Sequence, residues 1–107
     1  MGGPARRLLP TPPEMPPAVH TIVERRELAP RVTLFRVHAP EVAASRRPGQ
    51  FVMVRVAEGG ERIPLTIADG DPRTGTITLV VQEVGTTTSR MARLPLGAAL
   101  SDVVGPL

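Results

Sequence analysis

The stretch Glu61-Arg62-Ile63-Pro64-Leu65-Thr66-Ile67-Ala68-Asp69 carries the strongest signal for both fold and function in this chain. Successive side chains of a β-strand point to opposite faces. One face would then carry three aliphatic side chains that suit a core, namely Ile63, Leu65 and Ile67. The other would carry a cation, a flat rigid ring and a hydroxyl group, namely Arg62, Pro64 and Thr66. These groups match a ligand that presents a phosphate, a planar apolar ring and a hydrogen-bonding atom in that order.

The same spacing also fits a strand with a solvated outer face. Proline is tolerated at the edge of a sheet, so Pro64 marks an edge strand in that interpretation. In the middle of a strand it removes a ladder hydrogen bond, which calls for a functional reason without supplying one. The spacing alone leaves both interpretations open.

Composition limits the chain to one small domain with an aliphatic core. The 107 residues suffice for one domain of ordinary size, and they include two Phe but no Trp or Tyr. All 13 basic residues are Arg, and the net charge is only +3. Because Arg does not titrate near neutrality, the isoelectric point of about 11.3 overstates how basic the surface is.

The absence of cysteine removes several classes of site. The chain alone can form no disulfide, no zinc site with thiolate ligands and no iron–sulfur cluster. The two histidines lack metal-ligand spacing, and Ser89 and Ser101 have no evident base, so we predict neither a metal site nor a catalytic nucleophile. No apolar run approaches the roughly 20 residues of a membrane span. We predict a cytoplasmic protein.

The pattern of strands and turns predicts an all-β domain over residues 18–107, preceded by a flexible Pro-rich tail over residues 1–17. A helical turn is expected over 41–46 and one short helix over 86–94, where Thr86–Ser89 offer N-caps. Five or six short strands between turn signals indicate a six-stranded antiparallel Greek-key β-barrel. The expected strands are 19–28, 31–39, 50–56, 62–68, 76–84 and a loop and strand over 96–104.

A second motif, Gly85-Thr86-Thr87-Thr88, precedes the expected helix. Glycine permits close approach of the backbone to an anion, and the free amides of a helix N-terminus favour negative charge. The threonine hydroxyls would add hydrogen bonds to a pyrophosphate. An ordinary capped helix explains so short a motif as well.

Taken in order, Pro48-Gly49-Gln50-Phe51-Val52, Arg62–Asp69, Gly75–Val84 and Gly85–Thr88 resemble the FAD-binding barrel of the ferredoxin–NADP reductase superfamily. More narrowly, the chain resembles the group of sulfide dehydrogenases, NADH-dependent ferredoxin–NADP oxidoreductase alpha subunits and dihydroorotate dehydrogenase electron-transfer subunits. The resemblance runs from about Val19 to Leu107. One departure is that Thr66 follows Arg62 by four residues, where the wider superfamily usually has three.

The resemblance implies specific roles for the residues of both motifs. Arg62 would bind the flavin pyrophosphate, Pro64 would pack on the isoalloxazine ring and Thr66 would hydrogen-bond near flavin N5. Gly85, Thr86 and Thr87 would bind the pyrophosphate from the other side. The complete set of implied cofactor-binding residues is Arg62, Pro64, Leu65, Thr66, Val80, Val81, Gln82, Gly85, Thr86 and Thr87. No catalytic acid or base is implied.

For the complete family members, the resemblance implies electron transfer between NAD(P)H and an iron–sulfur carrier through the flavin. The expected partners are an oxidoreductase subunit, ferredoxin, or both, while the nicotinamide-nucleotide domain and the cysteines that hold a [2Fe–2S] cluster are missing here. Two alternatives stay open: a non-enzymatic, oligonucleotide-binding-like barrel, and an inert remnant. We expect no nucleic-acid partner, because only Phe35 and Phe51 are available to stack on bases.

Overall fold

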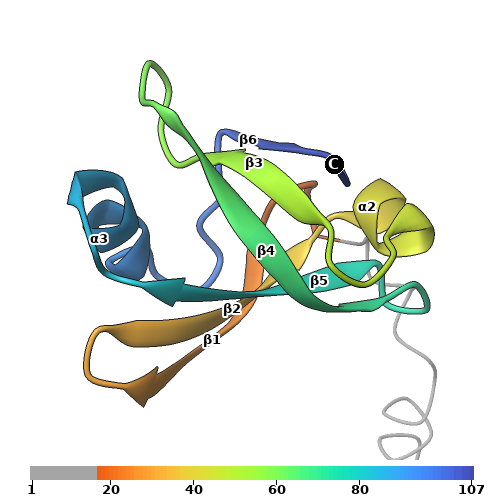
Figure 1. The fold of residues 1–107 in the computed structure, drawn as a ribbon, viewed down its shortest axis with the longest axis horizontal. Helices are drawn as coiled ribbons and strands as arrows, with labels where there is room; N and C mark the ends of the chain where they lie inside the picture. The colour runs from red at the N-terminus through yellow and green to blue at the C-terminus, as the bar shows by residue number, and fades with distance from the viewer. Residues whose placement is uncertain (1–16) are drawn as a thin grey trace, which may run out of the picture.

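The computed structural model describes residues 17–107, so the tail predicted for residues 1–17 lies, apart from Pro17, outside the described residues. Six strands and two short helices make up this part of the chain (Figure 1). The strands are β1 (Ile22–Ala29), β2 (Val32–His38), β3 (Phe51–Arg55), β4 (Arg62–Asp71), β5 (Thr76–Gln82) and β6 (Asp102–Val104). The helices are α2 (Pro40–Ser45) and α3 (Thr86–Ala92).

The strands form one antiparallel sheet in the order β1-β2-β5-β4-β3-β6. Strands β3, β4 and β5 follow one another as a meander, and β5 then lies beside β2, which is the Greek-key arrangement. The two ends of the sheet meet, because Ile22 donates to the Ala98 carbonyl at 2.8 Å and Gly97 donates to the Ile22 carbonyl at 2.9 Å. The predicted small Greek-key barrel is confirmed.

Several element boundaries differ from the expected ones, and three of these differences have a clear physical reason. Only Asp102–Val104 of the segment 96–104 is a strand, because the residues before it turn back to close the barrel against β1. The helical turn expected over 41–46 forms as α2, which starts at Pro40 since the first helical position needs no N–H. Strand β4 continues beyond residue 68 to Asp71 through a register shift between Ile67 and Asp69.

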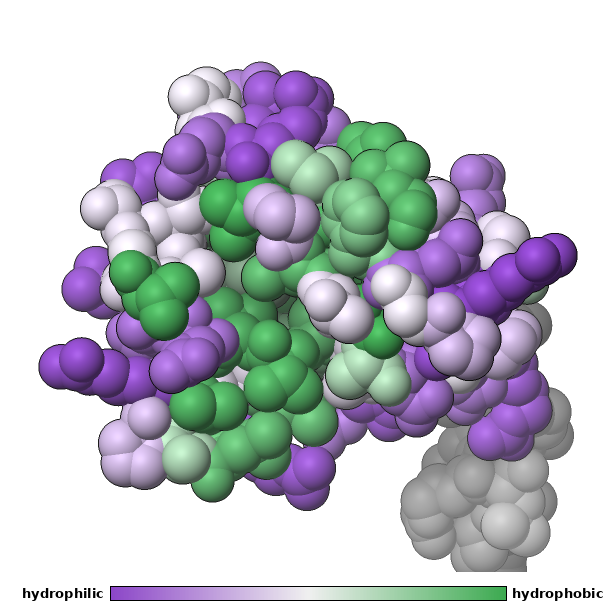
Figure 2. Space-filling model, viewed as in Figure 1, coloured by the Kyte–Doolittle hydropathy of each residue, from purple (hydrophilic) through white to green (hydrophobic). Residues whose placement is uncertain are grey.

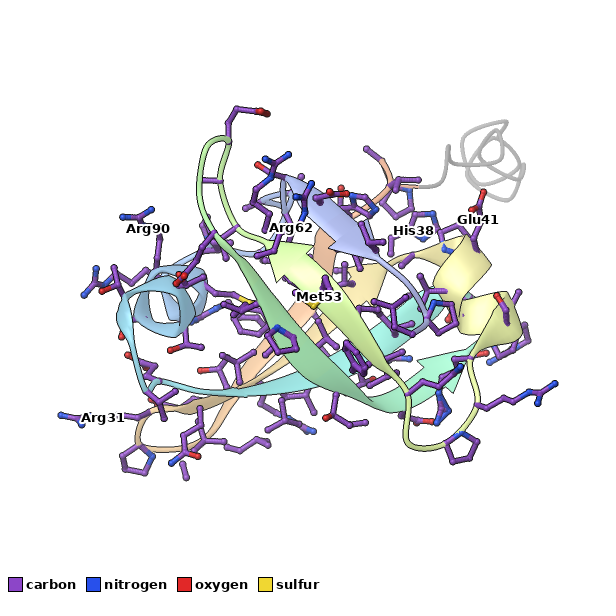
Figure 3. All side chains as sticks on the ribbon, turned by 45° about the horizontal axis from the view of Figure 1, so that its top comes forward. Arg31, His38, Glu41, Met53, Arg62 and Arg90 are labelled. Atoms are coloured by element: carbon purple, nitrogen blue, oxygen red, sulfur yellow. The ribbon has the colours of Figure 1, made fainter. Side chains whose placement is uncertain are left out.

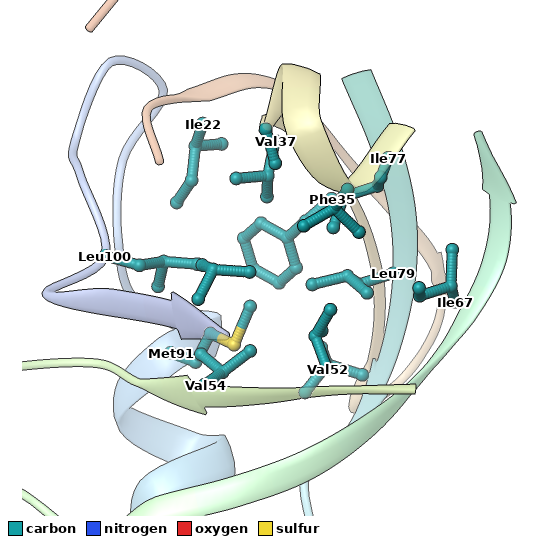
Figure 4. Close-up of a cluster of buried hydrophobic side chains, with 14 of the residues drawn as sticks. Ile22, Phe35, Val37, Val52, Val54, Ile67, Ile77, Leu79, Met91 and Leu100 are labelled. Carbon is teal, nitrogen blue, oxygen red and sulfur yellow. The ribbon is translucent and has the colours of Figure 1, made fainter. Parts of the chain in front are cut away.

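The core fills the barrel interior and is aliphatic, as the composition predicts (Figure 4). Phe35 is its single aromatic side chain and is fully buried. Every other member is a Val, Ile, Leu, Ala or Met side chain. The largest fully buried side chains are Phe35, Ile22, Ile77, Leu79, Met91, Val37, Val52, Val54 and Val81.

Helix α3 is held against the barrel by its last turn. Met91 is fully buried in the core, and Ala92 is buried beside it. The Arg25 guanidinium on β1 donates a hydrogen bond to the Ala92 carbonyl and lies 5.8 Å from the centre of the Phe35 ring. These contacts fix the helix, and with it the segment that precedes it.

We expect Met91→Ala to lower the free energy of unfolding by about 2–5 kcal/mol, because it removes a fully buried side chain and leaves a cavity. Urea denaturation followed by circular dichroism measures this loss. Met53→Ala is the matched control, since Met53 is only partly buried on the outer face of β3. An equal loss for both variants would contradict the anchoring role of Met91.

Candidate functional site

The outer face of β4 carries the three polar or rigid side chains that the sequence singled out. Arg62, Pro64 and Thr66 are exposed, whereas Ile67 is buried. Ile63 and Leu65 are partly buried and pack against the core, so the side chain of Leu65 points away from this face. The alternation predicted for Arg62–Ala68 is therefore the one observed.

Strand β4 changes partners along its length. Its first half, Arg62–Thr66, pairs with β3, and its second half, Ile67–Asp71, pairs with β5. Beyond Leu79, the residues of β5 pair only with β2 within the described part of the chain. The two strands therefore separate next to the segments 62–66 and 80–82, both of which the resemblance assigns to cofactor binding.

The separation explains why proline is tolerated in β4. The Ile67 N–H donates to the Gln50 carbonyl at 3.0 Å, toward the β3 side. Backbone N–H groups alternate in direction along a strand, so the nitrogen of Pro64 and the N–H of Thr66 face the opposite edge, which β5 has left. Pro64 thus costs no ladder hydrogen bond. Thr66 offers both a hydroxyl group and a backbone N–H at this separation.

On β5 the predicted residues divide between two faces. Val80 is 42% exposed and Gln82 is exposed, whereas Val81 is fully buried in the core. Only the backbone of Val81 can therefore contact a ligand. Figure 2 shows hydrophobic side chains gathered across the middle of the face that β4 crosses, with hydrophilic side chains toward its margins.

The start of α3 is capped differently from the expectation. Gly85, not one of Thr86–Ser89, occupies the N-cap position. The Thr88 hydroxyl reaches back to accept hydrogen bonds from Val84 N–H at 2.9 Å and Gly85 N–H at 3.0 Å. Thr88 is therefore used in capping, which leaves Thr86 and Thr87 for other contacts.

Thr87 joins the two motifs in space. Its hydroxyl donates to the Glu61 carboxylate at 2.5 Å, and Glu61 immediately precedes Arg62. Residues that lie 26 apart in sequence thus meet at one end of the separation between β4 and β5. Three of the predicted segments, 62–66, 80–82 and 85–87, border the same region.

Sequence reasoning missed the cations around α3, two of which, Arg90 and Arg93, lie in its last turn and at its C-cap. One open hollow of about 440 Å³ adjoins another of about 540 Å³, and the two share Gly85 and Ser89. The first is lined further by Thr86, Arg90 and Arg93, and the second by Arg31, Glu83 and Val84. The three-residue spacing of Arg90 and Arg93, which places them on one helix face, was the available signal.

Sequence reasoning also missed Asp102, which pairs with Arg62. An Arg62 guanidinium nitrogen lies 2.9 Å from a carboxylate oxygen of Asp102 on β6. The Arg62 side chain is labelled in Figure 3. The Arg62 side chain is 49% exposed and the Asp102 side chain 25% exposed. Arg55 of β3 is the register partner of both residues, so the ion pair spans a whole strand.

The ion pair alters the ionisation of Asp102. The hydrogen bond from Arg62 is the main cause that holds the pKa of the Asp102 carboxyl below its ordinary value of 3.8. The charges of Arg62, Arg55 and His20 act in the same direction, and desolvation opposes them. Ionised Asp102 therefore stabilises the fold above pH 3.8, and this contribution disappears as the pH falls through the lowered pKa.

We expect Asp102→Asn to destabilise the protein at neutral pH but to have little effect at low pH, where wild-type Asp102 is itself protonated. Urea denaturation of both proteins between pH 7 and pH 2 measures the difference in the free energy of unfolding. A difference that stays constant over this range would contradict the assigned pKa direction.

No family model matches the chain. An electron-transfer subunit homolog of dihydroorotate dehydrogenase B (NAD(+)) from Thermotoga maritima is 46% identical over 90 residues, which is 84% of this chain and 32% of that protein. The corresponding electron-transfer subunit from Fusobacterium nucleatum is 31% identical over 90 residues, 81% of this chain and 34% of that protein.

A solved structure of NADH-dependent reduced ferredoxin–NADP oxidoreductase, described in relation to flavin-based electron bifurcation, matches with a TM-score of 0.82. The two sequences are 45% identical, and the match covers 83% of this chain and 32% of the chain in the solved structure. The predicted relationship to dihydroorotate dehydrogenase electron-transfer subunits and NADH-dependent ferredoxin–NADP oxidoreductase is confirmed. The chain spans about one third of the length of the relatives it matches.

Residues 17–107 contain no group of three or more His, Asp or Glu side chains placed to hold a metal ion. Within the same residues, no helix has the length and apolar character needed to cross a bilayer.

Proposed function

We propose that this chain is the FAD-binding barrel of an electron-transfer oxidoreductase subunit. The observation that carries the proposal is the convergence of three segments, 62–66, 80–82 and 85–87, at the place where β4 and β5 separate. The electron-transfer role of the relatives supports it.

The residues present suit a flavin dinucleotide. Arg62 provides a guanidinium group, whose planar fork of donors matches a pyrophosphate. Pro64 on β4 and Val80 on β5 both present exposed apolar surface where the two strands separate, and a flat ring could lie against it. Thr66 supplies a hydroxyl and a backbone N–H on the same strand, at the far end from Arg62. Gly85, Thr86 and Thr87 border the pyrophosphate end through the contact of Thr87 with Glu61.

In this proposal the chain binds and orients, and the cofactor reacts. FAD, when bound, accepts a hydride and passes on single electrons. Thr66 holds the position of the reacting part of the ring, Pro64 and Val80 exclude water from one side of it, and Arg62 fixes the phosphates. The proposal assigns no proton transfer to any side chain of this chain.

The electron donor, the electron acceptor and the partner are proposed for the whole protein of which this chain would be the FAD-binding part. We propose NAD(P)H as the electron donor, and a [2Fe–2S] carrier outside this cysteine-free chain as the acceptor. The proposed partner is another oxidoreductase subunit, ferredoxin, or both, in line with the names of the relatives. A cytoplasmic location stays a prediction from the sequence.

Nucleic acid is not a proposed partner. Phe35, one of the two aromatic residues in the chain, is fully buried, and Phe51 is partly buried. Binding of single-stranded nucleic acid by barrels of this size relies on exposed aromatic side chains that stack on bases. Strongly salt-dependent binding of an oligonucleotide would instead favour the alternative barrel function.

The first test is retention of flavin. The purified chain, incubated with FAD and desalted, should keep the absorbance bands of bound flavin. A folded protein that keeps none would contradict FAD binding by this chain.

The second test is Thr66→Val, which removes the hydroxyl but keeps the shape. We expect a changed flavin reduction potential or a slower reduction rate, with a change in unfolding free energy within about 0.5 kcal/mol, because Thr66 is exposed. Thr78→Val is the matched control, since Thr78 lies on the part of β5 that still pairs with β4. An unaltered spectrum, potential and reduction rate in Thr66→Val would remove Thr66 from the site.

A further inference from the structure

We propose that Asp102 holds Arg62 in a position turned away from the cofactor, so that this ion pair must break before Arg62 can bind the pyrophosphate. Asp102 then sets the affinity of the site for the dinucleotide without contacting it. The inference rests on the proposed function, which supplies the ligand.

The direction of Arg62 follows from the order of the strands. Strand β4 has β3 and then β6 on one side, and β5, which leads into α3, on the other. The Arg62 guanidinium crosses β3 to reach Asp102 on β6, at 2.9 Å. The contact between Thr87 and Glu61 places the start of α3 on the opposite side. Arg62 therefore extends away from the residues with which it would share a pyrophosphate.

Arg55 is a second cation near Asp102, on the β3 side of β4. It lies between Arg62 and Asp102 in the register of the sheet, and its charge also favours the ionised carboxylate. The Arg55 Nε is buried and has no hydrogen-bond partner within residues 17–107. Asp102 is ion-paired with Arg62 and lies within the electrostatic influence of Arg55, which remains a nearby cation when Arg62 is released.

Because the ion pair of Arg62 and Asp102 is accessible to solvent, Arg62 can exchange the Asp102 carboxylate for a pyrophosphate. The Arg62 side chain is 49% exposed, so it can rotate without disturbing the core. Ion pairs this close to solvent contribute little, and the loss of one corresponds to roughly a two- to fivefold change in a binding constant. The effect of Asp102 on affinity should lie in that range.

The test compares the dissociation constants of FAD and riboflavin for the wild type and Asp102→Asn, measured by quenching of flavin fluorescence. Asp102→Asn should bind FAD roughly two- to fivefold more tightly, because Arg62 no longer has to leave a carboxylate. Riboflavin, which has no pyrophosphate, should bind both proteins equally. Glu58→Gln is the matched control, since it removes one negative charge from the exposed turn before β4 and should leave the FAD constant unchanged.

A double-mutant cycle shows whether Asp102 acts through Arg62. In an Arg62→Gln background, Asp102→Asn should no longer alter the FAD constant. Weaker FAD binding by Asp102→Asn would overturn the inference. It would show instead that Asp102 positions Arg62 to bind the cofactor. Unchanged FAD binding, or the same gain in both backgrounds, would overturn the inference alone. A wild-type chain that binds no FAD would overturn the proposed function, and the inference with it.

Discussion

The division of β4 between two neighbouring strands is the constraint on which the rest of the site depends. A strand in a closed barrel normally pairs along both edges, but β4 pairs with β3 over Arg62–Thr66 and with β5 only from Ile67 onward. The register shift after Ile67 accompanies the change of partner and increases the local bend of the strand. One edge of β4 is therefore left with backbone groups that no neighbouring strand satisfies, and these groups are open to water or to a ligand.

This separation can persist only because other contacts hold the barrel together around it. Helix α3 follows β5 directly, and the burial of Met91 fixes it to the core, with Arg25 attached to its last turn. The contact of Thr87 with Glu61 then links the start of the helix to the turn before β4. The two sides of the separation are thus connected through the helix rather than through the sheet, which leaves the intervening edge free.

Much of this arrangement could be predicted from the sequence, because its physical causes are local. The alternation over Arg62–Ala68 indicated which side chains face outward, and the strand and turn signals gave the barrel. Asp102 could not be found in this way, since its pairing with Arg62 depends on the register of three strands that are distant in sequence. The N-cap at Gly85 was missed because the Thr88 hydroxyl caps from inside the helix, and the sequence Thr86-Thr87-Thr88-Ser89 alone does not show which hydroxyl does so.

Two carboxylates of the chain, those of Glu61 and Asp102, already contact donors that the proposal assigns to the ligand. Glu61 accepts a hydrogen bond from Thr87, and Asp102 accepts one from Arg62, so each of these donors already has an anionic acceptor from the chain itself. A ligand gains only the difference between its own contacts and those it replaces. An anionic ligand must therefore offer more than one anionic group to compete, because a ligand with a single carboxylate would only exchange one carboxylate for another. A pyrophosphate, with two linked phosphates, meets this requirement, and a ligand with one carboxylate does not. Under the proposed function, the chain's own acidic side chains would therefore favour a dinucleotide over simpler anions.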